Sequence, residues 1–147
     1  MFKNSRINLL QKGFTLIELL IVIAILGILA ASTLAVLDPV DKIRAGNDSK
    51  VQSDVISIAK AAEAYSVAND GNYPSNLNAL VTSGNLRSVP TAPGGYTAYN
   101  FTGGGAADFI ISGQLKSKKY APATPVFKYE SAEGKSCAAA TRTTACP

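Results

Sequence analysis

Residues 12–37 read KGFTLIELLIVIAILGILAASTLAVL, and no other stretch of the chain is as apolar. The segment 19–37 contains nineteen residues and no charge. At about 1.5 Å per residue, a helix over residues 14–37 would be about 36 Å long, enough to cross the roughly 30 Å hydrocarbon core of a bilayer. In lipid the backbone must satisfy its own hydrogen bonds, which a single segment does as a helix. The stretch therefore predicts one membrane-spanning helix.

The excess positive charge lies just before this apolar stretch. The formal net charge is +4, from 14 basic and 10 acidic residues. Lys3, Arg6 and Lys12 lie within residues 1–13, which contain no acidic residue, and without them the net charge would be +1. Basic residues flanking a membrane span favour the cytoplasmic side. We therefore expect a single-pass protein with a cytoplasmic N-terminus, and no specific nucleic-acid partner.

Glu18 is the one acidic residue inside the apolar region. A carboxylate near the bilayer centre costs on the order of 2.5–3.5 kcal/mol, so it is a functional candidate that needs a partner. The alternative is that Glu18 simply reaches up to the lipid headgroups. A cleaved signal peptide, with its cut at Ala30-Ala31-Ser32, is a second alternative. Two features argue against a signal peptide. The apolar run is longer than a typical signal-peptide core, and it contains the acidic residue Glu18.

The sequence KGFTLIE at residues 12–18 resembles the signature of type IV prepilins and type II secretion pseudopilins. The resemblance implies that a membrane peptidase cleaves between Gly13 and Phe14 and N-methylates Phe14. It also implies that Glu18 matches the family's acidic residue, which neutralises the terminal amine of a neighbouring subunit. An amine and a carboxylate are each costly among apolar helices, and pairing offsets much of that cost and fixes the register of the helices.

The same resemblance implies a structural role and no enzymatic activity. The expected function is that of a subunit of a type IV pilus or related extracellular filament, assembled through its N-terminal helix. The expected partners are other pilin subunits, in a homo- or hetero-polymer, a prepilin peptidase, an inner-membrane assembly platform, and membrane lipid before assembly. The expected location is the bacterial inner membrane and then an extracellular or periplasmic filament. A type II secretion pseudopilin is the alternative, and a membrane-anchored binding domain a remote one.

A second helical segment follows the apolar run. Pro39 removes a backbone donor and predicts a kink or break in the helix. Residues 41–69 then show an amphipathic pattern, with Asp48 and Asp54 among the polar positions. The apolar stripe of this pattern consists of Val51, Val55, Ile58, Ala62 and Tyr65. We expect this stripe to pack against a globular part, and the helix to end at residues 69–72.

The remaining residues predict a small antiparallel sheet. Apolar runs at Tyr96–Phe101, Asp108–Ser112 and Val126–Tyr129 have strand character, and residues 103–105, all glycine, predict a turn. The predicted fold class is α+β and pilin-like: a long N-terminal helix, transmembrane and then amphipathic, packed on a small sheet. The predicted division is a cleaved leader 1–13, a transmembrane and polymerisation helix 14–37, an amphipathic helix 38–70, and a head 71–147.

No catalytic, cofactor or metal motif is present in the sequence. The chain contains no histidine, which excludes a Ser-His-Asp triad and histidine metal sites. Major secretion pseudopilins commonly bind calcium in a carboxylate-bearing C-terminal loop. Residues 102–147 contain only three acids, Asp108, Glu130 and Glu133, so we expect no metal, although calcium is left open.

Two cysteines, Cys137 and Cys146, lie close together near the C-terminus. On the exported side of a membrane, two such cysteines most simply form a disulfide. The alternative is a pair of free thiols in a frayed tail. We predict the disulfide, which would close the end of the head into a loop.

Overall fold

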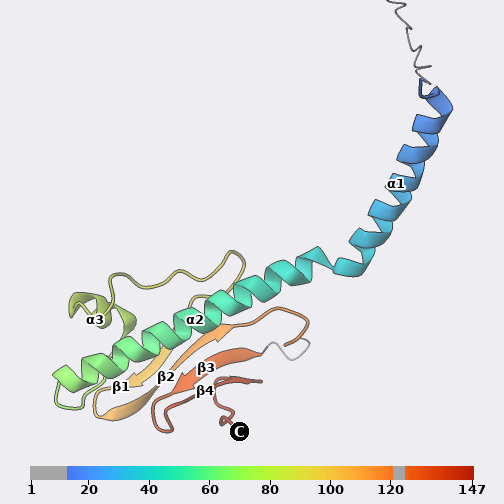
Figure 1. Ribbon diagram of the computed structural model, residues 1–147. Coiled ribbons are helices and arrows are strands. Elements are labelled where there is room, and N and C mark those ends of the chain that lie inside the picture. Colours follow the sequence, from blue (N-terminus) through green and yellow to red (C-terminus); the bar gives the residue numbers. More distant parts are fainter. Residues whose placement is uncertain (1–12, 121–124) are drawn as a thin grey trace, which may run out of the picture. The chain divides into compact units, whose positions relative to one another are not determined.

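The computed structural model describes residues 13–120 and 125–147, apart from the side chains of residues 34–37. Its backbone divides into two compact units, one ending at Asp38 and one beginning at Pro39. The helices and strands are shown in Figure 1. They are α1 (Leu16–Leu37), α2 (Pro39–Ala68), α3 (Leu77–Thr82), β1 (Asn100–Gly104), β2 (Ala107–Gln114), β3 (Val126–Glu130) and β4 (Lys135–Ala139). This confirms the predicted α+β class.

The helical backbone is interrupted between α1 and α2. Asp38 has φ 38° and ψ 73°, in the left-handed region that a non-glycine residue seldom adopts. The interruption lies one residue before Pro39, where the sequence predicted a kink or break. Pro39 is the first residue of α2, a position that suits its missing N–H donor.

The second unit is built on α2, which lies along one face of the sheet (Figure 1). Val51, Val55, Ile58 and Ala62 are fully buried, and Tyr65 packs at the edge of the same core. The predicted apolar stripe therefore faces the head. The helix ends where expected, because Asp70 and Gly71 adopt positive φ and Gly71 N donates to Ser66 O.

The sheet is an antiparallel meander with strand order β1-β2-β3-β4. Side chains alternate between its two faces. Phe109, Ile111 and Phe127 belong to the core shared with α2. Phe109 also stacks on Phe101, with ring centroids 5.2 Å apart, and meets Tyr73 edge-on at 4.8 Å. These rings join three separate parts of the chain into one core.

The strands differ in part from the prediction. The first strand is Asn100–Gly104, not Tyr96–Phe101, because Tyr96 and Tyr99 direct their hydroxyls to carboxylates of α2. The helix α3 and the strand β4 were not predicted. Asn76 caps α3 by accepting from Ala79 N at 3.0 Å, and β4 pairs with β3 along its whole length.

Candidate functional site

The N-terminus of α1 is closed by a capping box between Thr15 and Glu18. Thr15 Oγ1 accepts from Glu18 N at 3.3 Å, and Glu18 Oε2 accepts from Thr15 N at 2.9 Å. Thr15 Oγ1 also donates to Glu18 Oε2 at 2.7 Å. The reciprocal bonds satisfy donors that the first turn of a helix leaves unpaired. They also hold the Glu18 carboxylate at the very start of the apolar helix.

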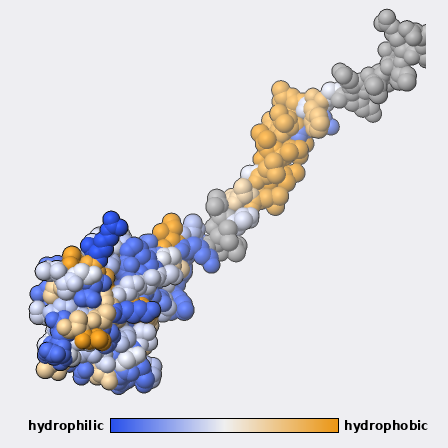
Figure 2. Space-filling model, turned by 60° about the vertical axis from the view of Figure 1, so that its left-hand side comes forward, coloured by the Kyte–Doolittle hydropathy of each residue, from blue (hydrophilic) through white to orange (hydrophobic). Residues whose placement is uncertain are grey.

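Over residues 16–33, whose side chains are described, the surface of α1 is almost entirely apolar and exposed. The large apolar side chains from Leu16 to Leu29 are 47–82% exposed, and Figure 2 shows the continuous hydrophobic surface that they form. The polar exceptions are internally satisfied, since the hydroxyls of Ser32 and Thr33 donate to Ile28 O and Leu29 O. Residues 16–33 are long and apolar enough to cross a membrane, as a signal sequence would also be.

The predicted processing residues lie immediately before this helix. Gly13 and Phe14 are exposed, and the Phe14 side chain is 84% exposed. The two residues and Glu18 thus share one accessible helix start. The basic residues Lys3, Arg6 and Lys12 lie outside the described residues. Thr15 is part of the signature at residues 12–18, but the sequence analysis assigned it no role, although Thr followed three positions later by Glu is a recognisable capping signal.

At the other end of the chain, Cys137 and Cys146 form a disulfide, with Cα atoms 5.7 Å apart. The predicted disulfide is therefore present in the structure. Cys137 lies in β4, and Cys146 returns after the turn that follows the strand. We call residues 137–146 the C-terminal loop.

The three acids of the C-terminal region do not form a ligand set. Glu130 pairs with Lys128 and Glu133 with Lys135, while Asp108 accepts from Ser131 Oγ at 3.3 Å. Within residues 13–120 and 125–147 there is no cluster of three or more potential metal ligands. These acids act as partners for neighbouring side chains.

Comparison with known proteins gives matches in one group. A family model described as "Prokaryotic N-terminal methylation motif" matches residues 9–34. The chain is 37% identical over 83 residues to a "Type II secretion system core protein G" of Pectobacterium carotovorum, covering 54% of this chain and 51% of that protein. It is 46% identical over 79 residues to "Type IV wide pilus major component PilA4" of Thermus thermophilus, covering 54% of this chain and 57% of that protein. The chain thus spans little more than half the length of these two relatives.

A further alignment covers a larger share of both chains. The chain is 32% identical over 122 residues to a "Type II secretion system core protein G" of Klebsiella michiganensis, covering 71% of this chain and 84% of that protein. No solved structure gives a significant match. The N-terminal motif, the capped apolar helix, the α+β head and this alignment agree. The chain therefore belongs to the family of type IV pilins and type II secretion pseudopilins.

Proposed function

We propose that this protein is a structural subunit of a type IV pilus or related extracellular filament, without enzymatic activity. The observation that carries the proposal is the uncovered apolar helix α1, which begins with a capped Glu18 directly after Gly13-Phe14. Such a surface is stable only against lipid or against other apolar helices. Membrane insertion followed by helix-to-helix assembly satisfies it at both stages.

The first step in this proposal is processing at the inner membrane. The N-terminus is cytoplasmic, a prepilin peptidase cleaves between Gly13 and Phe14, and Phe14 is N-methylated. Both residues are exposed and precede the first helical turn, so the bond to be cut lies in non-helical chain. An assembly platform then transfers the subunit from lipid into a homo- or hetero-polymer.

The second step is pairing between subunits. Cleavage creates a positive amine on Phe14, and Glu18 of a neighbouring subunit neutralises it. The capping box supports this proposal, because Thr15 gives the carboxylate local hydrogen bonds before any neighbour arrives. The amine and carboxylate lower each other's cost only at one axial stagger, so the pair also fixes the register of the helices.

The proposed organisation follows from these roles. Residues 1–13 are a leader, residues 14–37 anchor and then polymerise, and residues 38–70 support the head formed by residues 71–147. The interruption at Asp38 separates the polymerising part from the supporting helix. Pro39 at the start of α2 would keep the two helices from merging.

A role as a type II secretion pseudopilin is the second candidate. It is favoured by the Klebsiella michiganensis relative, whose alignment covers 71% of this chain and 84% of that protein. The relative named as a pilus component has the higher identity, but over a shorter stretch. Deleting the gene separates the two: loss of surface fibres with normal protein export supports the pilus, and loss of export without loss of fibres supports the pseudopilus.

Mass spectrometry of the mature N-terminus tests the proposal shared by both candidates. The expected product begins at N-methyl-Phe14, and Gly13→Leu is expected to leave the precursor uncut. A mature terminus at Ala31 or Ser32 would instead identify a signal peptide. That result would remove most of α1 from the mature protein and overturn the proposed function.

A further inference from the structure

Lys128 is a fully buried lysine on the outer face of the sheet. Its neighbours Phe127 and Tyr129 pack with the core under α2, so the alternation of β3 directs Lys128 to the opposite face. In the β3–β4 register Lys128 lies directly opposite Cys137. Paired residues of an antiparallel ladder share a face, so Lys128 and the disulfide lie on the same side of the sheet. The C-terminal loop covers the lysine there.

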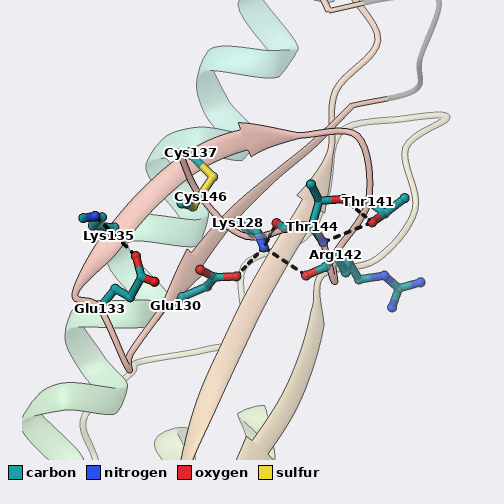
Figure 3. The surroundings of a disulfide bond; sticks show 9 residues. All are labelled: Lys128, Glu130, Glu133, Lys135, Cys137, Thr141, Arg142, Thr144 and Cys146. Atoms are coloured by element: carbon teal, nitrogen blue, oxygen red, sulfur yellow. Dashed lines mark hydrogen bonds and ion pairs between the residues drawn. A yellow bond between two sulfur atoms is a disulfide. The ribbon is translucent and has the colours of Figure 1, made fainter.

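The ammonium of Lys128 is surrounded by oxygen atoms (Figure 3). Nζ donates to Glu130 Oε1, to Arg142 O at 3.1 Å, and to Thr144 O. Glu130 comes from the same strand, whereas both carbonyls belong to the C-terminal loop. An ammonium group has three donors and no acceptor, so these three bonds use its whole hydrogen-bonding capacity.

This arrangement explains why a charged side chain is stable at 0% exposure. A buried ammonium is costly unless it is paired and fully hydrogen-bonded. The hydrogen bond from Lys128 lowers the pKa of Glu130, which keeps the carboxylate charged. The two carbonyl groups gain as well, because a loop that covers the sheet must find partners for its inward-facing backbone. The cation and the loop therefore stabilise each other.

We propose that the C-terminal loop is folded around an internal cation, and that the Lys128 ammonium is that cation. One carboxylate and two carbonyl oxygens are the ligand types that hard metal ions also take. Here the chain supplies the positive charge from its own sheet. The conformation of the loop consequently depends on Lys128 and not on a metal ion, in addition to the disulfide that ties its ends.

The loop held in this way forms part of the exposed surface of the head. Figure 3 shows the Arg142 side chain directed away from the ammonium that its carbonyl group contacts. Arg142 lines a surface cavity of about 300 Å³ together with Asn100, Ser112 and Gln114. Lys128 thus fixes the position of a charged residue beside β1 and β2. Loss of the ammonium should alter this surface without touching the core under α2.

The test uses the full chain in detergent and compares Lys128→Met with Lys135→Met. Methionine keeps most of the lysine volume and removes the charge, and Lys135 is an exposed control whose side chain is 58% exposed. Hydrogen exchange of the amides in residues 138–146 is expected to become at least tenfold faster in Lys128→Met and to stay unchanged in Lys135→Met. Exchange in β2 reports on the rest of the sheet and should change little in either variant. Equal loop protection in wild type and Lys128→Met would overturn the proposal.

Two further measurements keep the result decisive. EDTA and excess calcium should both leave loop exchange in the wild type unchanged, and opening of the loop by EDTA would show that a metal ion, not Lys128, organises it. If Lys128→Met fails to fold, the same measurement is made on Glu130→Gln. This variant keeps the side-chain volume and removes the negative charge that pairs with the Lys128 ammonium. Faster exchange in the loop with unchanged exchange in β2 supports the proposal. Unchanged loop exchange in Glu130→Gln contradicts it.

Discussion

At the scale of single residues, Asp48 joins the helix α2 to two distant segments. Its carboxylate is 1% exposed and accepts from Tyr96 Oη, Lys116 N and Ser117 N, each at 2.8 Å. Burial by itself would raise the pKa of Asp48. Hydrogen bonds from the side chain and backbone of Ser117, from Lys116 N and from Tyr96 outweigh burial and lower the pKa below its ordinary value. The charged form is thus the one that the fold requires.

Asp48→Asn should destabilise the head. The amide keeps the shape but presents only one acceptor oxygen, so at least one backbone N–H loses its partner, at a cost of roughly 1–3 kcal/mol. Asp70→Asn is the matched control, because Asp70 is exposed with φ 53° and asparagine tolerates that conformation. Urea unfolding of both variants measures the difference. A cost for Asp48→Asn no larger than that for Asp70→Asn would contradict the role of Asp48.

The burial of Asp48 shows which residues resist prediction from sequence. Helical periodicity placed Asp48 among the polar positions of α2, and it is nevertheless buried. Its partners at Lys116 and Ser117 are 68 and 69 positions away, so no local sequence pattern predicts these hydrogen bonds. Glu18 contrasts with it, because the capping partner lies three residues away and the motif is readable locally.

At the scale of elements, hydrogen bonds between tyrosines and carboxylates attach α2 to the sheet and its loops. Glu63 accepts from Tyr73 Oη and from Tyr129 Oη, both at 3.0 Å. Burial and then the hydrogen bond to Glu63 raise the pKa of Tyr129 to about 12 from its ordinary value of 10.0. The helix is therefore held to β3 by a bond that exists only while the tyrosine is protonated.

This bond predicts a loss of stability at alkaline pH. A group whose pKa is raised by folding contributes fully below its ordinary pKa and loses that contribution as pH rises through the raised value. The free energy of unfolding should therefore fall between pH about 10 and about 12, and Tyr129→Phe should reduce that fall by roughly 1–2 kcal/mol. Tyr65→Phe is the control, since the described part of the chain offers its hydroxyl no hydrogen bond. Parallel pH profiles for wild type and Tyr129→Phe would refute the assignment.

Helix α2 approaches the sheet closely at Gly113 of β2. A Cβ atom there would lie 2.5 Å from Val51 Cγ1 and 3.0 Å from the Tyr99 ring. Gly113→Ala should therefore cost roughly 1–3 kcal/mol through overpacking. Combined with Val51→Ala, which removes the obstructing methyl group, the cost should be smaller than the sum of the two single variants.

Gly46→Ala provides the control for Gly113→Ala. Gly46 lies in α2, and a Cβ atom at this position meets nothing within 4 Å. Alanine should thus stabilise the helix by about 0.5–1 kcal/mol. Thermal or denaturant unfolding of the four variants tests the packing. Additive costs for Gly113→Ala and Val51→Ala would show that the two positions do not share the contact.

The elements that sequence reasoning missed are those with weak local signals. The strand β4 reads KSCAA and has little strand propensity. It forms because it pairs with β3, and its middle residue, Cys137, belongs to the disulfide. The helix α3 has six residues, too few to show periodicity. The long helical segments were predicted because their apolar patterns extend over many turns.

At the scale of the whole molecule, the two units differ in whether they bury their apolar side chains. The unit that begins at Pro39 buries its own core between α2 and the sheet. The apolar side chains of α1 are left uncovered in the described structure, apart from residues 34–37, whose side chains are not described. The head can therefore be tested for folding, whereas α1 must be tested for assembly. Substitution of Glu18 is the most direct test of the proposed assembly.

Glu18→Gln and Glu18→Val separate the charge of Glu18 from its capping role. Glutamine preserves the capping box and removes the charge, while valine removes both. If pairing with the Phe14 amine of a neighbour drives assembly, both variants should be cleaved and remain in the membrane at wild-type abundance, yet yield little fibre. A buried amine without its partner would oppose packing by several kcal/mol per subunit.

Neither variant should change the melting of the head, since Glu18 lies in the other unit. The measurement is the yield of sheared fibres relative to the membrane pool, at equal expression. Normal fibre yield from Glu18→Gln, with loss only in Glu18→Val, would assign Glu18 to capping alone and remove the charge pair from the mechanism.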